Sequence, residues 1–587
     1  MNSRLSAALL ILILAGSFAL KLHHLDHAAV KPLDEVFHAI VARNFLKHPL
    51  TPTLVDRPFL AVDRDDWLNN HIWLHKPPLA LWQISASFFL LGVNTLALRL
   101  PSAILSTLAA WLTYLIGCRL LDRTAALVAA ALQAFNPVIL MLVHGYVFSD
   151  HVDISLLFWT ELSIYFLVRG LPPTSGDSGG EAFHEKHRRV FLILCGIAQG
   201  LAFLSKTYPA LITTVLAIVA IRSIRRKGIL TLVLSTIATI APWLIWTAIR
   251  FPHEFARENL QILHHLNENV ENWAAPWDQL VFYYWISIFH VFYPAIIAAA
   301  AAFLLRAYQE KRLASWLILA WAAGVMVPHL LATSKPMTAT LIGWPAAWLM
   351  FGNLVSRAVR GDRLALGTWL ASMLLAILFL HHDSIPTGGE NWGRIPVGFA
   401  VIMRQHLWVL WHVLAALAAG AILSMLAISP KVRRFAAGFA AAAAIFLAAI
   451  WWKGDHPPGY FKVAVEVTQI NANTPDFADV GQFAARLPAN SAFLVDERSR
   501  LENKLVEFAV DRSCYPATEK NWPDLARQLE QAGALPYLFT SASPEAKPSG
   551  PEAKPSGVPL PVVHVDLQNG RTVYACTPAA KLAAGAR

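Results

Sequence analysis

Apolar runs of near-bilayer length recur along the chain from residue 5 to residue 452 and constrain its fold more than any other feature. A helix needs about 20 apolar residues to cross the hydrocarbon core of a bilayer, within a range of about 17 to 25. Only 15% of the residues are charged, against about 25% in soluble globular proteins. The chain is therefore expected to be an integral membrane protein of mainly α class, a polytopic bundle of transmembrane helices.

About thirteen spans are expected, near residues 5–21, 101–118, 124–142, 153–169, 190–205, 208–222, 229–249, 279–304, 313–332, 338–355, 364–381, 405–427 and 435–452. The first is expected to be retained rather than removed as a secretory signal, because no small-x-small cleavage site follows it. Residues Pro77–Leu91 are apolar but too few to cross a bilayer comfortably. We expect them to form a helix on the outer interface, with the Trp82 ring at headgroup depth.

Lysines and arginines gather in six short segments between the expected spans. These segments hold 19 basic residues, against six in the intervening short loops, and they are Arg119–Arg123, Arg169–Arg189, Arg222–Lys227, Arg306–Arg312, Arg357–Arg363 and Lys431–Arg434. Because basic loops stay on the cytoplasmic side, this asymmetry predicts an inside N-terminus and an outside C-terminus. It also explains the net charge of +10, so nucleic acid is not expected as a partner.

The composition changes after residue 453. Residues 454–587 alternate short apolar strands, near 491–495, 537–540, 562–565 and 572–575, with helical stretches near 477–487 and 522–531. This pattern predicts a soluble extracytoplasmic α/β domain that follows a transmembrane domain of residues 1–453. Cys514 and Cys576 both fall in the outer domain, and in an oxidising compartment they are candidates for a disulfide.

The first outer loop, residues 22–100 with its juxtamembrane helices, is unusually polar for so apolar a chain. It begins with Lys31-Pro-Leu-Asp-Glu-Val-Phe-His38 and closes with Trp73-Leu-His-Lys-Pro-Pro78. The predicted orientation places it on the same side as several ionisable span ends, so that one face gathers Asp34, Glu35, Lys76, Arg99, Asp150, Asp153, Lys206 and Lys335. Ionisable groups at membrane depth cost about 2.5–3.5 kcal/mol on insertion scales and mark functional sites.

Carboxylates and cations that share a cleft beside lipid suit a reaction on a lipid-linked phosphate. The cations would neutralise phosphate oxygens while a carboxylate takes a proton from an attacking hydroxyl. Each residue also has a structural interpretation. Lys76 and Arg99 can be interfacial side chains that keep their charge in water, and Lys206 can be a turn residue. Asp150 and Asp153 can be helix caps, and Asp34 and Glu35 can be a solvated pair.

The histidines show no HExxH or Cys/His spacing typical of metal ligands. They are expected in loops or at the interface, and they include His23, His24, His27, His38, His71, His75, His264 and His265.

Short motifs occur in a fixed order over about residues 5–355. They are Asp34-Glu35 after the first span, Lys76-Pro-Pro-Leu79, Arg99-Leu-Pro-Ser102, Asp153 followed by Leu156-Leu-Phe-Trp159, Gly200-Leu-Ala-Phe-Leu-Ser-Lys206, Ala241-Pro-Trp243, Thr333-Ser-Lys-Pro336 and Trp344-Pro345. Together they resemble the GT-C class of membrane glycosyltransferases, in the branch of protein O-mannosyltransferases and bacterial aminoarabinose (lipid A) transferases. Phe37 and His38 stand where that family usually has a Tyr, and Thr207-Tyr208 where Gly is common.

The resemblance implies an enzyme that takes a sugar from a polyprenyl-phosphate donor and transfers it with inversion. The acceptor would be a lipid A-like glycolipid, a protein or another glycan. The resemblance also implies a multi-pass protein of the bacterial inner membrane, surrounded by membrane lipids, with its active site and C-terminal domain facing the periplasm. The departures from the family pattern leave the sugar and the acceptor open.

The resemblance also suggests roles for the ionisable residues. Asp34 would act as general base on the acceptor hydroxyl or phosphate, with Glu35 assisting or positioning it, and Asp153 would orient the acceptor or a bound metal. The donor phosphate would be held by cations, namely Lys76, Arg99 and Lys206, with Lys335 as a further candidate. No residue is assigned as a metal ligand, and a divalent metal is left open as a cofactor.

Two other classes of function also fit a polytopic membrane protein. A transporter or flippase for lipids or sugars would bury charges in broken helices at the membrane midplane, whereas the predicted charges cluster on one face. A non-catalytic scaffold with an outer binding domain would not need thirteen spans as its anchor. Sugar transfer is therefore the favoured hypothesis.

Overall fold

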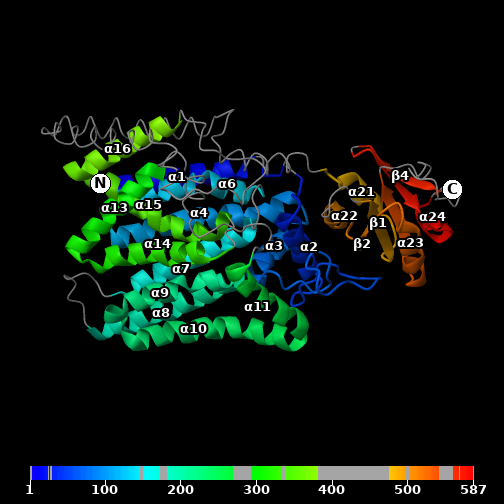
Figure 1. The fold of residues 1–587 in the computed structure, drawn as a ribbon, viewed down its shortest axis with the longest axis horizontal. Coiled ribbons are helices and arrows are strands. Elements are labelled where there is room, and N and C mark those ends of the chain that lie inside the picture. The colour runs from blue at the N-terminus through cyan, green and yellow to red at the C-terminus, as the bar shows by residue number, and fades with distance from the viewer. Residues whose placement is uncertain are drawn as a thin grey trace.

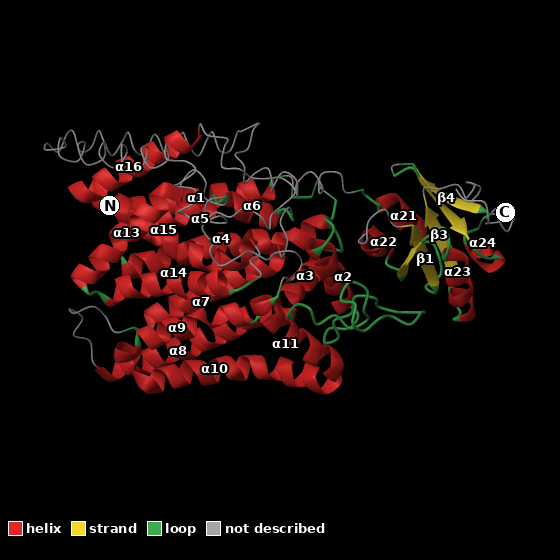
Figure 2. Ribbon diagram, viewed as in Figure 1, coloured by secondary structure: helices red, strands yellow, loops and turns green. Residues whose placement is uncertain are grey.

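The computed structural model describes residues 3–23, 25–26, 29–145, 150–171, 181–268, 293–333, 337–380, 475–496, 502–540, 560–567 and 569–585. A large helical part and a smaller part that contains a β-sheet lie at opposite ends of the molecule (Figures 1 and 2). The first outer loop, drawn in blue in Figure 1, lies at the end of the helical part that faces the sheet. The fold therefore places this loop at the junction of the two parts.

The described helices of the large part follow in chain order. They are α1 (Ser3–Leu22), α2 (Asp34–Phe45), α3 (Pro78–Leu91), α4 (Thr95–Leu120), α5 (Arg123–Ala134), α6 (Pro137–Val143), α7 (Asp150–Arg169), α8 (Glu181–Lys206), α9 (Ile212–Val219), α10 (Ile221–Arg250), α11 (Pro252–Asn267), α13 (Tyr293–Glu310), α14 (Leu313–Leu331), α15 (Trp344–Val359) and α16 (Arg363–Leu380). Short 3₁₀ helices, η1 (Tyr208–Leu211) and η2 (Met337–Gly343), precede α9 and α15.

Five helices among the described residues are long and apolar enough to cross a membrane, namely α1, α4, α7, α8 and α10. The mainly α bundle with a small C-terminal sheet is thus confirmed. The total of thirteen spans stays a prediction, and the expected spans 405–427 and 435–452 lie outside the described residues. The expected short helix after Pro77 is present as α3, with 14 residues.

The expected span 124–142 is not one helix. It divides into α5 and α6 at Phe135 and Asn136. Pro137 has no N–H to donate and disfavours helical backbone in the residue before it. The Asn136 side chain accepts instead from the N–H groups of Val138 and Ile139, at 2.9 and 3.3 Å. The prediction of a single span was wrong because it counted apolar residues and ignored this cap.

Glycines let neighbouring helices of the bundle approach closely. A Cβ added at Gly196 of α8 would lie 2.3 Å from the carbonyl oxygen of Leu232 in α10. A Cβ added at Gly352 of α15 would lie 2.2 Å from the carbonyl oxygen of Ala125 in α5. Small residues at helix crossings are the usual means of packing helices tightly within a membrane.

A buried carboxyl group connects three helices of the bundle. Glu161 of α7 is fully buried, and its two oxygens lie 2.6 Å from the Thr113 hydroxyl of α4 and 2.5 Å from Gln133 Nε2 of α5. The Thr113 hydroxyl also lies 2.5 Å from Gln133 Oε1. Because one hydroxyl proton cannot serve two acceptors, we infer that Glu161 is protonated and donates to Thr113. The three side chains then form a closed ring of hydrogen bonds.

Replacing Glu161 with Gln is expected to preserve this ring, because the amide donates and accepts where the protonated carboxyl does. Replacing it with Leu leaves Thr113 and Gln133 without their buried partner, at a cost of about 1–3 kcal/mol. Thermal unfolding in detergent should therefore leave the Gln variant close to the parent and lower the Tm of the Leu variant. Equal destabilisation by both substitutions would show that Glu161 is ionised.

The C-terminal part is a five-stranded sheet with helices. Its strands are β1 (Ser491–Asp496), β2 (Cys514–Ala517), β3 (Leu535–Thr540), β4 (Val562–Asp566) and β5 (Arg571–Ala575), in the order β2-β1-β3-β5-β4. β1 pairs in parallel with β2 and β3, whereas β5 runs antiparallel to β3 and β4. The helices are α21 (Ala478–Ala484), α22 (Glu502–Val510), α23 (Trp522–Gln531) and α24 (Pro578–Ala583). The four predicted strands and two predicted helices are confirmed.

The expected disulfide between Cys514 and Cys576 is wrong, because neither cysteine takes part in a disulfide. Cys514 begins β2 and Cys576 follows β5, so β1 and β3 separate their strands. Three strand spacings of about 4.8 Å put them roughly 14 Å apart, beyond the Cα separation of about 4.4–6.8 Å that a disulfide spans.

The first outer loop and α2 contact the sheet-containing part directly. Arg43 of α2 donates to the Phe508 carbonyl at 2.7 Å and pairs with Asp511 at 3.2 Å, both at the C-terminal end of α22. Cations stabilise this end of a helix. The Tyr515 hydroxyl of β2 accepts from the backbone N–H of Phe59, at 2.8 Å. These contacts couple the position of α2 to that of the sheet.

Candidate active site

The helix α2 carries the two predicted carboxylates in its first turn. Its chain enters through Leu33, whose φ of +67° is uncommon for a residue other than glycine. This turn brings the backbone N–H of Lys31 to 2.6 Å from Glu35 Oε2. Asp34 is half-buried and Glu35 is buried, and a negative charge in the first turn interacts favourably with the helix dipole.

Glu35 forms a buried ion pair with Arg99 of α4. Arg99 donates from Nε to Glu35 Oε1 at 2.6 Å and from Nη2 to Oε2 at 3.0 Å. The same guanidinium donates to the carbonyls of Leu25 and Ala29, both at 3.1 Å. Burial acts to raise the pKa of Glu35, but the Arg99 charge and its hydrogen bonds hold that pKa below its ordinary value. The donor groups of the Arg99 guanidinium are therefore directed to Glu35 and to two backbone carbonyls.

Asp153 and Lys206 form a second pair. Asp153 lies in the first turns of α7, is buried, and accepts from Lys206 Nζ, at the end of α8, at 2.5 Å. Its other oxygen accepts from the Thr338 hydroxyl at 2.5 Å. The alternatives of a helix cap for Asp153 and a turn residue for Lys206 do not describe this arrangement, because the two side chains hold each other across two helices.

His38 lies near both ion pairs, and it was not predicted as a site residue from the sequence. Its ring is fully buried, 6.1 Å from the Trp73 ring and 6.5 Å from the ring of His151 in α7. His151 is in turn hydrogen-bonded to Ser102 of α4 at 2.5 Å. Burial lowers the pKa of His38 to about 4, so the ring is neutral at neutral pH. One signal for it exists in the sequence, since His38 lies four residues after Asp34 and thus on the same helix face.

The charges of four predicted site residues act on His38. They are Asp34, Lys76, Asp153 and Lys206. The fold therefore brings together residues that are up to 172 positions apart in the chain. The two carboxylates and two cations thus act on one buried ring, from the N-terminal turns of α2 and α7, the C-terminal end of α8 and the loop before α3.

Lys76 differs from the other cations of this group. It precedes Pro77 and the N-terminus of α3, is half-buried, and has no hydrogen-bond or ion-pair partner among the described residues. Its neighbour His75 is fixed, since it lies 3.2 Å from Glu258 of α11 and stacks on Trp67 with ring centroids 4.6 Å apart. A lysine without a carboxylate partner, in a loop held at this point, is available to an anionic ligand.

The remaining predicted positions are less informative. Asp150 is the first residue of α7, as expected for a residue at a helix start. Lys335 lies outside the described residues. Within the part of the chain that the structure describes, no group of three or more His, Cys, Asp or Glu side chains could hold a metal ion. The described residues therefore do not fit a divalent metal, and no step is assigned to one.

Comparison with known proteins gives matches of two kinds. A family model described as dolichyl-phosphate-mannose-protein mannosyltransferase matches residues 75–246, which include Lys76, Arg99, Asp153 and Lys206. The undecaprenyl phosphate-alpha-4-amino-4-deoxy-L-arabinose arabinosyl transferase of Pseudomonas aeruginosa (strain UCBPP-PA14) is 26% identical over 350 residues, 54% of this chain and 57% of that protein. Its counterpart in Aeromonas hydrophila is 24% identical over 375 residues, 59% of this chain and 64% of that protein. The chain thus spans less than two thirds of the length of these relatives.

Solved structures share the fold over almost the whole chain. The crystal structure of ArnT from Cupriavidus metallidurans bound to undecaprenyl phosphate has a TM-score of 0.60 at 16% identity, covering 97% of this chain and 98% of that one. An oligosaccharyltransferase from Archaeoglobus fulgidus, tethered to an acceptor peptide, has a TM-score of 0.51 at 13% identity, covering 92% of this chain and 69% of that one. At these identities the likeness is one of fold.

Proposed function

We propose that this chain, which shares the fold of the GT-C class of membrane glycosyltransferases and matches the protein mannosyltransferase family model, transfers a sugar from a polyprenyl-phosphate donor. The resemblance to that class predicted from the motifs is confirmed. The observation that carries the proposal is that the charges of four predicted site residues, Asp34, Lys76, Asp153 and Lys206, act on the buried His38 ring. Among the described residues Lys76 forms no ion pair or hydrogen bond.

The proposed reaction is a single displacement at the anomeric carbon. An acceptor oxygen attacks this carbon from the face opposite the phosphate, and its proton passes to the Asp34 carboxylate. The bond between the anomeric carbon and the phosphate oxygen breaks, and the polyprenyl phosphate leaves with one more negative charge. Lys76 and Lys206 would stabilise that charge through electrostatic interactions with the phosphate oxygens. The nucleophile comes from the substrate, so positioning supplies much of the rate.

The two ion pairs, Glu35 with Arg99 and Asp153 with Lys206, would position the groups that react or bind phosphate. Glu35 and Arg99 tie the chain after α1 to α2 and α4, and thereby fix the first turn that carries Asp34. Asp153 holds the Lys206 ammonium on the phosphate side. These assignments keep the positioning role predicted for Glu35. They change the role of Arg99 from phosphate contact to positioning residue, and the role of Asp153 from orienting the acceptor to orienting Lys206.

The donor and acceptor that we propose rest on the cations of the site and on the substrates named for the matched relatives. Matched relatives are named for an undecaprenyl-phosphate-linked sugar, and one structure with this fold holds undecaprenyl phosphate. We therefore propose a polyprenyl-phosphate-linked pentose or hexose as donor and a lipid A-like glycolipid or a protein as acceptor. The proposal includes inversion at the sugar, thirteen spans over residues 1–453, and a periplasmic domain of residues 454–587 in a bacterial inner membrane. None of the matched relatives or structures named above is a transporter.

Mass spectrometry of cells with and without this protein tests the proposal. Lipid A or an envelope glycoprotein is expected to lose the mass of one sugar residue when the protein is absent, and to regain it when the wild-type chain is supplied. The size of the difference names the sugar, and the fraction that contains it names the acceptor. Identical masses in every lipid and glycoprotein fraction would contradict sugar transfer.

A further inference from the structure

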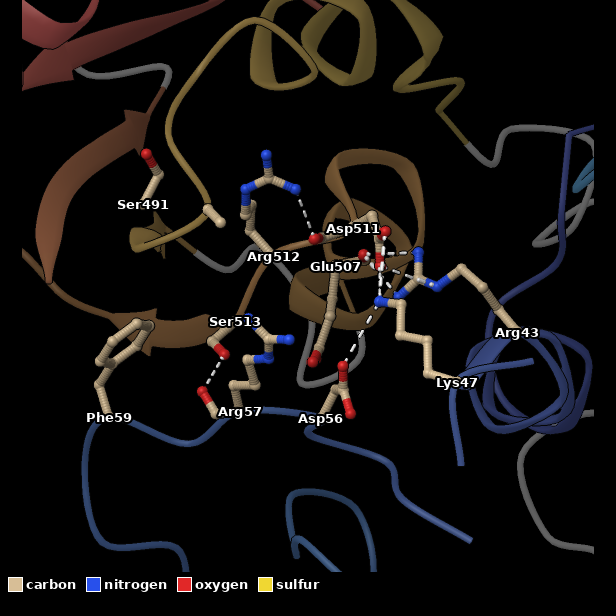
Figure 3. A pocket seen from close by; sticks show the side chains of 11 residues that line it. Arg43, Lys47, Asp56, Arg57, Phe59, Ser491, Glu507, Asp511, Arg512 and Ser513 are labelled. Atoms are coloured by element: carbon tan, nitrogen blue, oxygen red, sulfur yellow. Dashed lines mark hydrogen bonds and ion pairs between the residues drawn. The ribbon is translucent and has the colours of Figure 1, made fainter. Parts of the chain in front are cut away.

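A hollow of about 230 Å³ lies where the first outer loop and α2 meet the sheet-containing part (Figure 3). Four cationic side chains line it, one from α2, one from the second residue after α2, one from the loop and one from the residue after Asp511. They are Arg43, Lys47, Arg57 and Arg512. Three carboxylates also line it, namely Asp56, Glu507 and Asp511. None of these residues belongs to the proposed sugar-transfer site.

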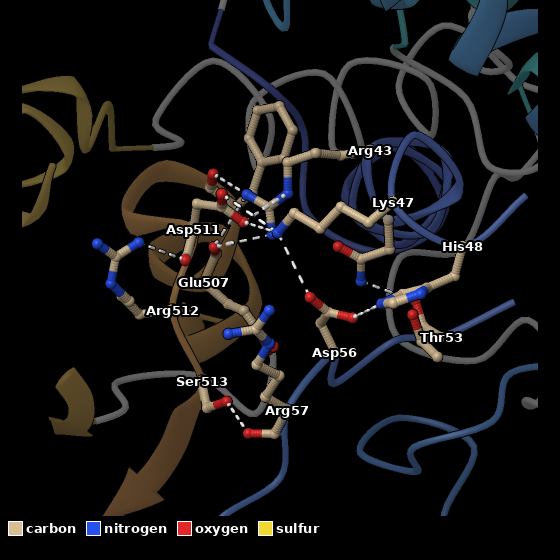
Figure 4. Close-up of polar contacts among 12 residues, drawn as sticks. Arg43, Lys47, His48, Thr53, Asp56, Arg57, Glu507, Asp511, Arg512 and Ser513 are labelled. Carbon is tan, nitrogen blue, oxygen red and sulfur yellow. Dashed lines mark hydrogen bonds and ion pairs between the residues drawn. The ribbon is translucent and has the colours of Figure 1, made fainter. Parts of the chain in front are cut away.

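The three carboxylates are already paired, as Figure 4 shows for two of them. Asp511 is shared by Arg43 and Lys47, each at 3.2 Å. Asp56 lies 3.4 Å from Lys47 and 3.1 Å from His48. Glu507 is held by Lys504, at 2.6 Å, in a buried pair. The three carboxylates of the hollow are therefore neutralised by Arg43, Lys47 and Lys504.

Two guanidinium groups remain without a carboxylate. Arg512 donates only to backbone carbonyls in the described structure, including those of Asp511 at 2.9 Å and Leu487 at 3.0 Å. The Arg57 side chain is exposed and has no hydrogen bond or ion pair to any described residue. The hollow thus carries an excess of positive charge next to Ser513 and Ser491.

The loop that carries Arg57 is held against β2 and the residue before it at two points, at Arg57 and two residues later. The Ser513 hydroxyl donates to the Arg57 carbonyl at 2.6 Å. Two residues further on, the backbone N–H of Phe59 donates to the Tyr515 hydroxyl at 2.8 Å. The position of the Arg57 backbone beside Arg512 is therefore built into the contact between loop and sheet, and only the end of the side chain is left to adapt.

We propose that this hollow binds a phosphate group, with Arg57 and Arg512 as the contacting side chains. Guanidinium groups match phosphate oxygens in geometry and form charge-assisted hydrogen bonds with them. The phosphate belongs to a small anion or to the headgroup of an anionic lipid. Arg43 lies nine residues after Asp34 on α2, which puts the hollow about 14 Å along the helix axis from the sugar-transfer site. The ligand is thus distinct from the donor.

Binding to the purified full-length chain in detergent tests this inference with two probes. Inorganic phosphate is followed by thermal shift, and phosphatidylglycerol, with phosphatidylcholine as reference, by native mass spectrometry. Arg57→Gln is expected to weaken binding of the active probe about tenfold or more, the effect of removing one charge-assisted contact. Arg527→Gln, which changes an exposed arginine of α23 elsewhere on the same part, should leave binding unchanged.

The outcomes separate the sources of the phosphate. Binding of inorganic phosphate that Arg57→Gln weakens supports a small anion, and binding of phosphatidylglycerol alone that it weakens supports a lipid headgroup. Binding that survives Arg57→Gln but is lost in Lys76→Gln belongs to the proposed donor site and overturns the inference. Absence of binding with both probes overturns it as well, and leaves the proposed sugar transfer unaffected.

Discussion

Replacing Asp34 with Asn is expected to abolish sugar transfer while the protein remains folded and inserted in the membrane. The amide has nearly the shape of the carboxylate but cannot take the proton of the attacking acceptor. General-base catalysis contributes typically 10²–10⁴-fold to a rate, so activity should fall by at least about a hundredfold. Mass spectrometry of lipid A and envelope glycoproteins, together with turnover of the purified enzyme, measures the loss.

A carboxylate elsewhere in the same loop provides the matched control. Asp63 is exposed, and among the described residues its carboxylate accepts only from the backbone N–H of Asp65, so Asp63→Asn should retain activity. Membrane insertion and Tm of both variants should match those of the parent. Full activity of Asp34→Asn would refute the assignment of the base. A drop in Tm of Asp34→Asn alone would show that Asp34 supports the first turn of α2.

Much of this fold can be predicted from local patterns in the sequence. Apolar periodicity and length mark α1, α4, α7, α8 and α10, because a helix in lipid must satisfy its own backbone. The strand β2 was missed. It has four residues and contains Pro516, which a strand tolerates at a sheet edge because no ladder partner needs its N–H, and β2 is indeed at the edge.

The candidate site contains features that local sequence patterns do not predict. The sequence predicts that Asp34, Lys76, Asp153 and Lys206 face one compartment, because topology alone decides that. It does not predict which cation pairs with which acid. Arg99 was expected on the donor phosphate, yet its partner is Glu35, 64 residues earlier. Glu35 and Arg99 are brought together because α3 packs against both α2 and α4, and no spacing rule contains that information.

Replacing Arg99 with Met is expected to destabilise the protein strongly. The substitution keeps an apolar side chain of similar length but leaves Glu35 buried without its counter-charge, and it leaves the carbonyls of Leu25 and Ala29 without a donor. Removing one partner of a buried ion pair costs about 3–5 kcal/mol. Unfolding of the purified chain in detergent should show this as a large drop in Tm. Arg312→Met, at an exposed arginine that is 3.9 Å from Glu310, should cost less than about 1 kcal/mol.

The pH dependence of Tm tests whether the buried charge of Glu35 causes the destabilisation of Arg99→Met. In the parent, Arg99 holds the pKa of Glu35 below its ordinary value of 4.5, so this stabilisation is present above that pH and is lost as the pH falls through the lowered pKa. In Arg99→Met the charge and hydrogen bonds of Arg99 no longer oppose burial, so the pKa of Glu35 is higher than in the parent, even though the backbone N–H of Lys31 still donates to it. The folded variant therefore takes up a proton more readily and gains stability relative to the parent as the pH falls. The difference in Tm between parent and variant should therefore narrow on acidification, and adding Glu35→Gln to Arg99→Met should restore part of the Tm at neutral pH. A gap that stays constant with pH, and a double variant no more stable than the single one, would show that Arg99 acts through packing rather than through the charge of Glu35.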